Sequence, residues 1–206
     1  MWEFNSAIQT IYDGHVQQHI PNYDKVISKS INICKVECDY NDAIIDVGCA
    51  NGATLYKLYD AGFKNLYGVD SSVDMIAGFD HNKASITISK TLPSYKYKVV
   101  LANWVLHFIK DKTSYIKDIY NNLDNGGVAI ISNKTSNDPL FLDFYHKFKS
   151  DQGVSDHAIL EKAEQLKGVM FVESVDWYTN QFKLYNFSQV EIIDADWCFT
   201  TFFLRK

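Results

Sequence analysis

The sequence predicts an α/β fold with a doubly wound, mostly parallel sheet, N-terminal helices and a C-terminal antiparallel hairpin. Three observations support this prediction. Short apolar runs alternate with amphipathic stretches along most of the 206 residues. A turn that contains two glycines, GCANG at 48–52, joins the first apolar run to the next helical stretch. Two adjacent strand-like runs near residue 206 are typical of a hairpin.

Two helices are expected before the first strand. Polar and apolar residues alternate at helical spacing over residues 1–40, and the segment HIPNY at 19–23 interrupts the pattern. Proline lacks a backbone N–H and restricts the residue before it. We therefore place one helix before Pro21 and a second from about Tyr23 to Cys38.

The central segment supplies the alternation of strands and helices that is typical of a parallel sheet with right-handed crossovers. Strands are expected at 43–47, 65–70, 85–89, 98–104 and 128–132. Helices are expected at 53–62, at 73–80 with Ser71 or Ser72 as N-cap, and at 110–127, where glycines end the helix.

The last part of the chain changes character. Residues 139–186 are expected to be helical. Residues 189–194 and 196–206 are expected to form two strands joined by a short turn, and hence an antiparallel hairpin. With the five central strands, they make a sheet of seven.

Composition excludes several classes of protein. A hydrophobic content of 47% indicates a folded domain, and the net charge of −5 argues against broad nucleic-acid binding, so no direct nucleic-acid partner is expected. No apolar run reaches about 18 residues, and MWEFNSAIQT lacks a basic region before an apolar core, so neither a membrane span nor a signal peptide is expected. The four cysteines have no zinc-like spacing, which predicts reduced thiols in a cytoplasmic protein and no metal site.

The turn after the first strand is the expected ligand site. Ligands of a doubly wound sheet bind at the carboxyl ends of its strands, and Gly48 and Gly52 fall there. Without a Cβ atom, these residues let the backbone turn sharply and let a ligand lie against main-chain N–H groups. Both dinucleotides and S-adenosylmethionine (SAM) use such a turn, and the alternative is an ordinary turn without a ligand.

Two carboxylates beside the turn bear on that choice. Asp46 precedes Gly48 by two residues, where it would repel a pyrophosphate and attract the ammonium and sulfonium groups of SAM. Asp70 ends the next strand, where it can accept hydrogen bonds from the ribose of either ligand. The pattern favours SAM, with Asp46, Gly48, Gly52 and Asp70 as contacts.

The motifs DVGCANG, YGVDSS, VVLANWVLHF and LDNGGVAIIS resemble those of the class I SAM-dependent methyltransferases, whose fold is Rossmann-like. This resemblance covers nearly the whole chain and implies SAM, or its product S-adenosylhomocysteine (SAH), as the bound cofactor. It implies one SAM-binding domain over 1–206, with a helical lid at 1–40 and a sheet core at 41–206 that contains a helical insert at about 139–186.

A narrower resemblance is to the carboxy-SAM synthase family, which converts SAM and prephenate to carboxy-SAM, used by a partner enzyme to modify wobble uridine in tRNA. It is carried by HIPNYDKVI, NWVLHFIKD, ISNKT, FKSDQG and GVMFVESVD. The resemblance implies a homodimer. The cofactor contacts that it implies are Tyr23, Gly48, Cys49, Ala50, Asp70, Ser71, Ser89, Lys90 and Asn103.

The substrate side departs from that family. Its members use an arginine on the late helix to hold the carboxylate of carboxy-SAM, and the alignment of SVDWYTNQF places Gln181 there. An uncharged amide does not replace a bidentate guanidinium–carboxylate pair, although Lys134 matches a family lysine elsewhere. We therefore expect methyl transfer from SAM to a small-molecule acceptor. Carboxy-SAM synthesis and a non-catalytic SAM-binding protein are the alternatives.

Three further features each have two interpretations. His107, just after the fourth strand, is either a general base or a packed residue at the start of a helix. The run HKFK at 146–149 either binds an anionic substrate or forms a solvated face. The pair WY at 177–178 either lines the substrate pocket or belongs to the core.

Overall fold

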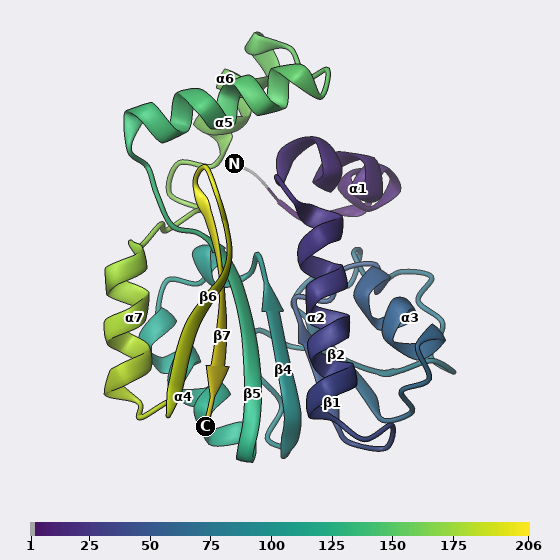
Figure 1. The fold of residues 1–206 in the computed structure, drawn as a ribbon. Helices are drawn as coiled ribbons and strands as arrows, with labels where there is room; N and C mark the ends of the chain where they lie inside the picture. The colour runs from purple at the N-terminus through teal and green to yellow at the C-terminus, as the bar shows by residue number, and fades with distance from the viewer. Residues whose placement is uncertain (1–2) are drawn as a thin grey trace.

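In a computed structural model, which describes residues 3–206, the predicted sheet of seven strands is present (Figure 1). The strands are β1 (Ile44–Val47), β2 (Leu66–Asp70), β3 (Ser85–Ile88), β4 (Tyr97–Asn103), β5 (Leu123–Lys134), β6 (Gln189–Asp196) and β7 (Phe199–Arg205). Their order is β3-β2-β1-β4-β5-β7-β6. Strands β1 to β5 run parallel, and β7 is antiparallel to both β5 and β6. The predicted fold class, including the C-terminal hairpin, is confirmed.

Helices cover both faces of this sheet. They are α1 (Ser6–His19), α2 (Tyr23–Glu37), α3 (Ala53–Asp60), the short 3-10 helix η1 (Leu106–Phe108), α4 (Lys112–Asn122), α5 (Pro139–Asp151), α6 (Asp156–Gln165) and α7 (Val175–Leu184). The predicted break at Pro21 and the helical nature of most of 139–186 are therefore confirmed.

The core consists of two apolar layers, one on each side of the sheet. Successive strand residues point to opposite faces. Ile44 accordingly packs in a cluster with Leu55 of α3, whereas Ile45 packs in a cluster with Ile116 of α4 and Phe182 of α7. All five side chains are fully buried. The parallel strands are buried on both faces, which explains why they appear in the sequence as continuous apolar runs.

Two predicted elements are wrong. Residues 73–80 form turns rather than a helix, although the Ser72 hydroxyl does accept a hydrogen bond from the backbone N–H of Met75 as an N-cap would. The hydrogen bonds there join residues three apart, and Gly78 adopts a φ of +84°, which ends any helical path.

The helix predicted at 110–127 ends at Asn122. Leu123 adopts an extended backbone and pairs with Tyr97 of β4, so the glycine-containing segment leads into β5 instead of capping the helix. Leu123 is fully buried in the core. Burial of this side chain is favoured over another helical turn made of Asp, Asn and Gly, which are poor helix formers.

The two N-terminal helices differ in their positions. Helix α2 lies on the sheet, where Lys29 pairs with Asp194 of β6 at 2.6 Å and Glu37 pairs with Arg205 of β7 at 2.7 Å. Helix α1 lies beyond the carboxyl ends of the strands, and α5 and α6 lie on the opposite side of that end (Figure 1). The described part of the segment 1–40 is thus partly a layer of the core and partly a cover over the strand ends.

The turn between β1 and α3 is held by hydrogen bonds from its backbone N–H groups. The N–H of Gly48 donates to the carbonyl of Val69 at 2.7 Å, and the N–H of Ala50 donates to the carboxylate of Asp70 at 2.9 Å. Gly52 has a φ of +81°, and a Cβ atom built on it would lie 2.1 Å from the ring of Phe79. Glycine is required at position 52 both by the backbone conformation and by the ring.

Gly52 and Gly78 provide a matched pair for testing this packing. Both have a positive φ, but a Cβ atom at Gly78 would meet no atom within 4 Å. We expect Gly78→Ala to lower the free energy of unfolding by about 1–2 kcal/mol through backbone strain. Gly52→Ala should cost roughly 1–3 kcal/mol more, because the ring of Phe79 must move. Urea unfolding measures both, and equal losses would contradict the close approach of Phe79.

Candidate active site

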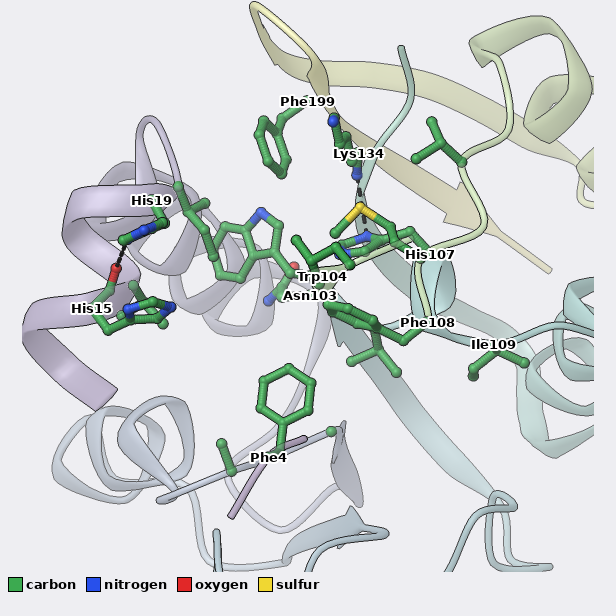
Figure 2. Close-up of a pocket in the computed structure, with 18 of the residues that line it drawn as sticks. Phe4, His15, His19, Asn103, Trp104, His107, Phe108, Ile109, Lys134 and Phe199 are labelled. Atoms are coloured by element: carbon green, nitrogen blue, oxygen red, sulfur yellow. Dashed lines mark hydrogen bonds between the residues drawn. The ribbon is translucent and has the colours of Figure 1, made fainter. Parts of the chain in front are cut away.

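A cavity of about 920 Å³ opens at the carboxyl ends of the parallel strands. The last residues of four strands contribute to its wall: Val47, Asp70, Asn103 and Lys134. Helices α1, η1, α5 and α6 contribute much of the remaining wall, together with loops and single residues of α4 and β7. Figure 2 shows His15 and His19 of α1 on one side and His107 and Lys134 on the other, with Trp104 between them.

Most of the residues predicted to contact the cofactor meet at this cavity. Those that line it are Gly48, Ala50, Asp70, Ser71, Ser89, Lys90 and Asn103. Tyr23, Asp46 and Cys49 line a smaller hollow beside it, which shares Gly48 and Asn103 with the large cavity. Gly52 lines neither and contributes through the shape of the turn. The sequence prediction thus selected residues that come from five separate segments and lie around two adjoining hollows.

Asp70 connects the two sides of the glycine turn. Its carboxylate accepts hydrogen bonds from the backbone N–H groups of Ala50 and Ser72, each at 2.9 Å. An ionised carboxylate has about four lone-pair sites. Asp70 is therefore fixed in position and still able to accept hydrogen bonds from the hydroxyl groups of a ligand.

Asp46 is a buried acid beside the turn. Only 4% of its surface is exposed, and burial, followed by the charge of Asp70, raises its pKa to about 8. The phenols of Tyr12 and Tyr23 lie close enough that Asp46 also raises their pKa values, although burial is the larger cause for both. A cation placed here would be attracted to the carboxylate and would favour its ionised form.

Asn103 provides an unused donor. Its Oδ1 accepts a hydrogen bond from the hydroxyl of Ser132 at 2.7 Å, which fixes the amide, while its buried Nδ2 has no partner among residues 3–206. A buried amide donor without a partner is costly, by about 1–3 kcal/mol. A ligand that carries both a cationic group for Asp46 and an acceptor for Asn103 fits this wall, and the amino-acid end of SAM carries both.

Two aromatic residues at the site were not predicted from the sequence. Trp104 has a φ of +60°, which is unusual for a bulky residue, and its ring stacks on that of Tyr23 at 4.8 Å. Tyr12 of α1 lines both hollows. Trp104 directly follows Asn103, so its position after the fourth strand was the available signal. Tyr12 had no signal beyond its place in an amphipathic helix.

The surroundings of His107 favour the packed interpretation. The side chain is 3% exposed, and burial lowers its pKa to about 3. Its Nδ1 atom lies 3.2 Å from the backbone N–H of Lys134, which donates to it, and 3.2 Å from Oδ1 of Asn133. A neutral imidazole held in this way connects η1 to β5, and so weak a base is poorly matched to proton transfer near neutral pH.

The remaining predicted residues separate into different environments. Gln181 lies in α7 outside the residues that line the cavity, with Oε1 buried and unpartnered among residues 3–206. Tyr178 is fully buried in the core. In the run at 146–149, His146 and Lys149 line the cavity, whereas the exposed Lys147 pairs with Asp151 on the surface.

Comparison with known proteins decides the family. A family model described as a methyltransferase domain matches residues 19–191, which is most of the chain. The chain belongs to this methyltransferase family. This protein is accordingly a transferase of one-carbon groups, and SAM is its cofactor.

Relatives and solved structures agree with this assignment. The chain is 25% identical to carboxy-S-adenosyl-L-methionine synthase of Nautilia profundicola, over 100% of this chain and 94% of that protein. Its identity to the synthase of Helicobacter hepaticus is 27%, over 93% and 89% of the two chains. Magnesium protoporphyrin IX methyltransferase from Synechocystis, solved with bound SAH, has the same fold, with a TM-score of 0.65, 14% identity and coverage of 100% and 90%.

A SAM-dependent methyltransferase from Archaeoglobus fulgidus also shares the fold, with a TM-score of 0.65, 12% identity and coverage of 95% and 99%. Within residues 3–206, none of the helices has both the length and the apolar composition needed to cross a membrane. The predictions that the protein is cytoplasmic and that it forms a homodimer stay predictions.

The buried Asp46 predicts a pH dependence of stability. Its pKa is about 8 in the folded chain against an ordinary value of 3.8. Between about pH 4 and pH 8 the unfolded state loses a proton that the folded state retains, so this residue increasingly destabilises the fold as pH rises. Asp46→Asn should therefore gain stability over the wild type as pH rises from 5 to 8.

Unfolding curves at several pH values test this expectation. Asp80→Asn, a change at an exposed carboxylate, controls for the general loss of a negative charge. Parallel pH profiles for the wild type and Asp46→Asn would show that Asp46 is not held protonated in the folded state.

Proposed function

We propose that the protein transfers the methyl group of SAM to a small-molecule acceptor that binds in the same cavity. The observation that carries this proposal is the continuity of the cavity. Its wall extends from Gly48, Asp70 and Asn103 to residues of α5 and α6, such as Tyr145 and Lys162. One end therefore suits the cofactor, and the other is available for an acceptor.

The proposed cofactor contacts follow from the chemistry of the wall. Asp46 and Asn103 hold the amino-acid end of SAM, because they offer a buried carboxylate and an unused amide donor. Asp70 accepts hydrogen bonds from the ribose hydroxyls. Ser89 and Lys90 flank the adenine side, as the family resemblance implies.

Catalysis in this proposal consists mainly of alignment. SAM supplies an electrophilic methyl group on a sulfonium centre, and a nucleophile held in line with it needs little further assistance. Trp104 and Tyr23, stacked on each other, fix the wall near Asn103, and Tyr12 and His15 of α1 cover the cavity. These residues orient the reactants and exclude water, while the strongly lowered pKa of His107 argues against a role as general base.

Carboxy-SAM synthesis is the second candidate. It is favoured by relatives of that name that align with 92% or more of this chain. It is disfavoured by Gln181, which has no charge and lies outside the cavity. The connection to tRNA modification and the homodimer rest on the same resemblance.

Binding of SAM or SAH tests the cofactor assignment. Asp70→Ala should weaken binding by roughly 1–3 kcal/mol, because the ligand and the glycine turn would both lose the charged carboxylate that accepts their hydrogen bonds. Asp80→Ala removes a surface carboxylate that lies outside both hollows and serves as the control. Titration calorimetry gives both affinities. An unchanged affinity in Asp70→Ala, with the control also unchanged, would place the cofactor elsewhere.

Product analysis separates the two reactions. We expect the wild type, incubated with SAM and prephenate, to form no carboxy-SAM, because the cavity lacks the family's arginine. Mass spectrometry detects carboxy-SAM as a species heavier than SAM by the mass of CO₂. Its accumulation during turnover would reject methyl transfer in favour of carboxy-SAM synthesis.

A further inference from the structure

The cavity carries a charge opposite to that of the protein. The chain has a net charge of −5. Among the described residues that line the cavity, Asp70 is the one carboxylate, and it lies at the cofactor end. The lysines that line the cavity are Lys90, Lys110, Lys134, Lys149, Lys162 and Lys167. Because the protein is acidic overall, the lysines in this cavity make its electrostatic potential more attractive to anions than the potential over the rest of the surface.

Three of these lysines form a cluster at the acceptor end. Lys134 ends β5, Lys149 lies in α5 and Lys162 lies in α6, so the cluster joins the sheet to the helical insert. Their charges interact: the pKa of Lys149 is lowered to about 8 by burial and by Lys134, and that of Lys162 to about 6 by burial and by Lys149. Positive groups have thus been brought together at an electrostatic cost.

Two of these lysines, Lys134 and Lys149, form no ion pair with a carboxylate among residues 3–206. Lys149 is only 4% exposed, yet neither it nor Lys134 has an aspartate or glutamate within ion-pair distance. An uncompensated buried ammonium is expensive, and such groups are normally paired. Binding of an anion beside these lysines would offset this cost.

The ring of Tyr145 positions two of the ammonium groups. Its hydroxyl donates to the backbone carbonyl of His19 at 2.7 Å, which fixes the ring between α5 and α1. Lys149 Nζ lies 4.1 Å and Lys134 Nζ 5.5 Å from the ring centroid. Cation–π contacts replace part of the lost solvation and leave the N–H donors of both lysines free of a carboxylate.

The wall near the cluster contains His146 but is otherwise largely apolar. It includes Leu142, Tyr145, Leu166, Met170 and Phe199. An acceptor that suits this end combines an anionic group with an apolar or ring-shaped body. Each lysine ammonium group acts as a compact point charge and therefore suits a compact oxyanion, such as a carboxylate or a phosphate.

From this geometry we infer that Lys134, Lys149 and Lys162 form the anion-binding subsite for the acceptor, which is a small organic oxyanion with an apolar body. The inference rests on the proposed function, since it names the substrate class of the same cavity. It assigns acceptor recognition to β5, α5 and α6, and not to the late helix α7, where Gln181 lies outside the cavity.

Binding of simple probes tests the subsite. Phthalate is a dicarboxylate, phenyl phosphate is a phosphate monoester, and benzamide is a neutral analogue of similar shape. Titrated into the SAH-saturated wild type, at least one of the two anions should bind at least tenfold more tightly than benzamide. Which anion binds distinguishes a carboxylate acceptor from a phosphate acceptor.

Substitutions locate the binding. Lys149→Met and Lys162→Met keep much of the side-chain volume and remove an amine whose positively charged form a bound anion favours, and each should weaken anion binding at least tenfold. Lys147→Gln is the matched control, because Lys147 lies in the same helix but pairs with Asp151 outside the cavity. It should leave anion binding unchanged. Thermal melting establishes that each variant is folded.

The outcomes separate this inference from the proposed function. Unchanged anion affinity in folded Lys149→Met and Lys162→Met, equal loss in Lys147→Gln, or benzamide binding as tight as the anions would overturn the subsite. Absence of SAH binding in the wild type would instead reject the proposed function. In that case the same titrations on the protein without SAH still decide whether the lysine cluster binds anions.

Discussion

The carboxylate of Asp70 joins two segments of the candidate site, and the positions of the residues around the glycine turn depend on this connection. It accepts hydrogen bonds from the N–H groups of Ala50 and Ser72, and so ties the turn after β1 to the end of β2. The conformation of this turn determines where α3 begins, where Gly48 lies and how Phe79 packs against Gly52. Asp70 thus helps to fix the proposed cofactor end of the cavity, while the proposed acceptor end is built from other segments.

The proposed acceptor end depends on contacts between parts of the chain that are distant in sequence. Helix α1 contributes His15 and His19, and α5 and α6 contribute Tyr145, Lys149 and Lys162. The hydrogen bond from Tyr145 to the carbonyl of His19 connects these two groups of helices directly. Helix α2 is anchored to β6 and β7 by ion pairs, whereas residues of α1 line the cavity.

The sequence predicted the sheet, and it also selected residues that the fold brings to one cavity, because both depend on local patterns. Continuous apolar runs mark strands buried on two faces, and glycines with acids mark the turn. Residues 73–80 were mispredicted because Phe79 packs on Tyr56, at a ring distance of 5.1 Å, and tertiary packing overrides helical spacing. The sequence indicated only part of the lysine cluster, because the run at 146–149 that contains Lys149 was a candidate for anion binding, whereas Lys162 had no such signal. Lys134, Lys149 and Lys162 belong to three elements, and only the fold brings them together.

The position of β7 has a consequence for how the protein is made. This strand, Phe199–Arg205, lies between β5 and β6, and its Phe202 and Leu204 are fully buried in the core. During synthesis, β6 leaves the ribosome with no neighbour to pair with, and β5 has one open edge, until β7 emerges. The nascent chain must therefore keep an unfinished sheet edge protected for longer than a protein whose strands pair in chain order, and this makes late folding a natural point for chaperone assistance.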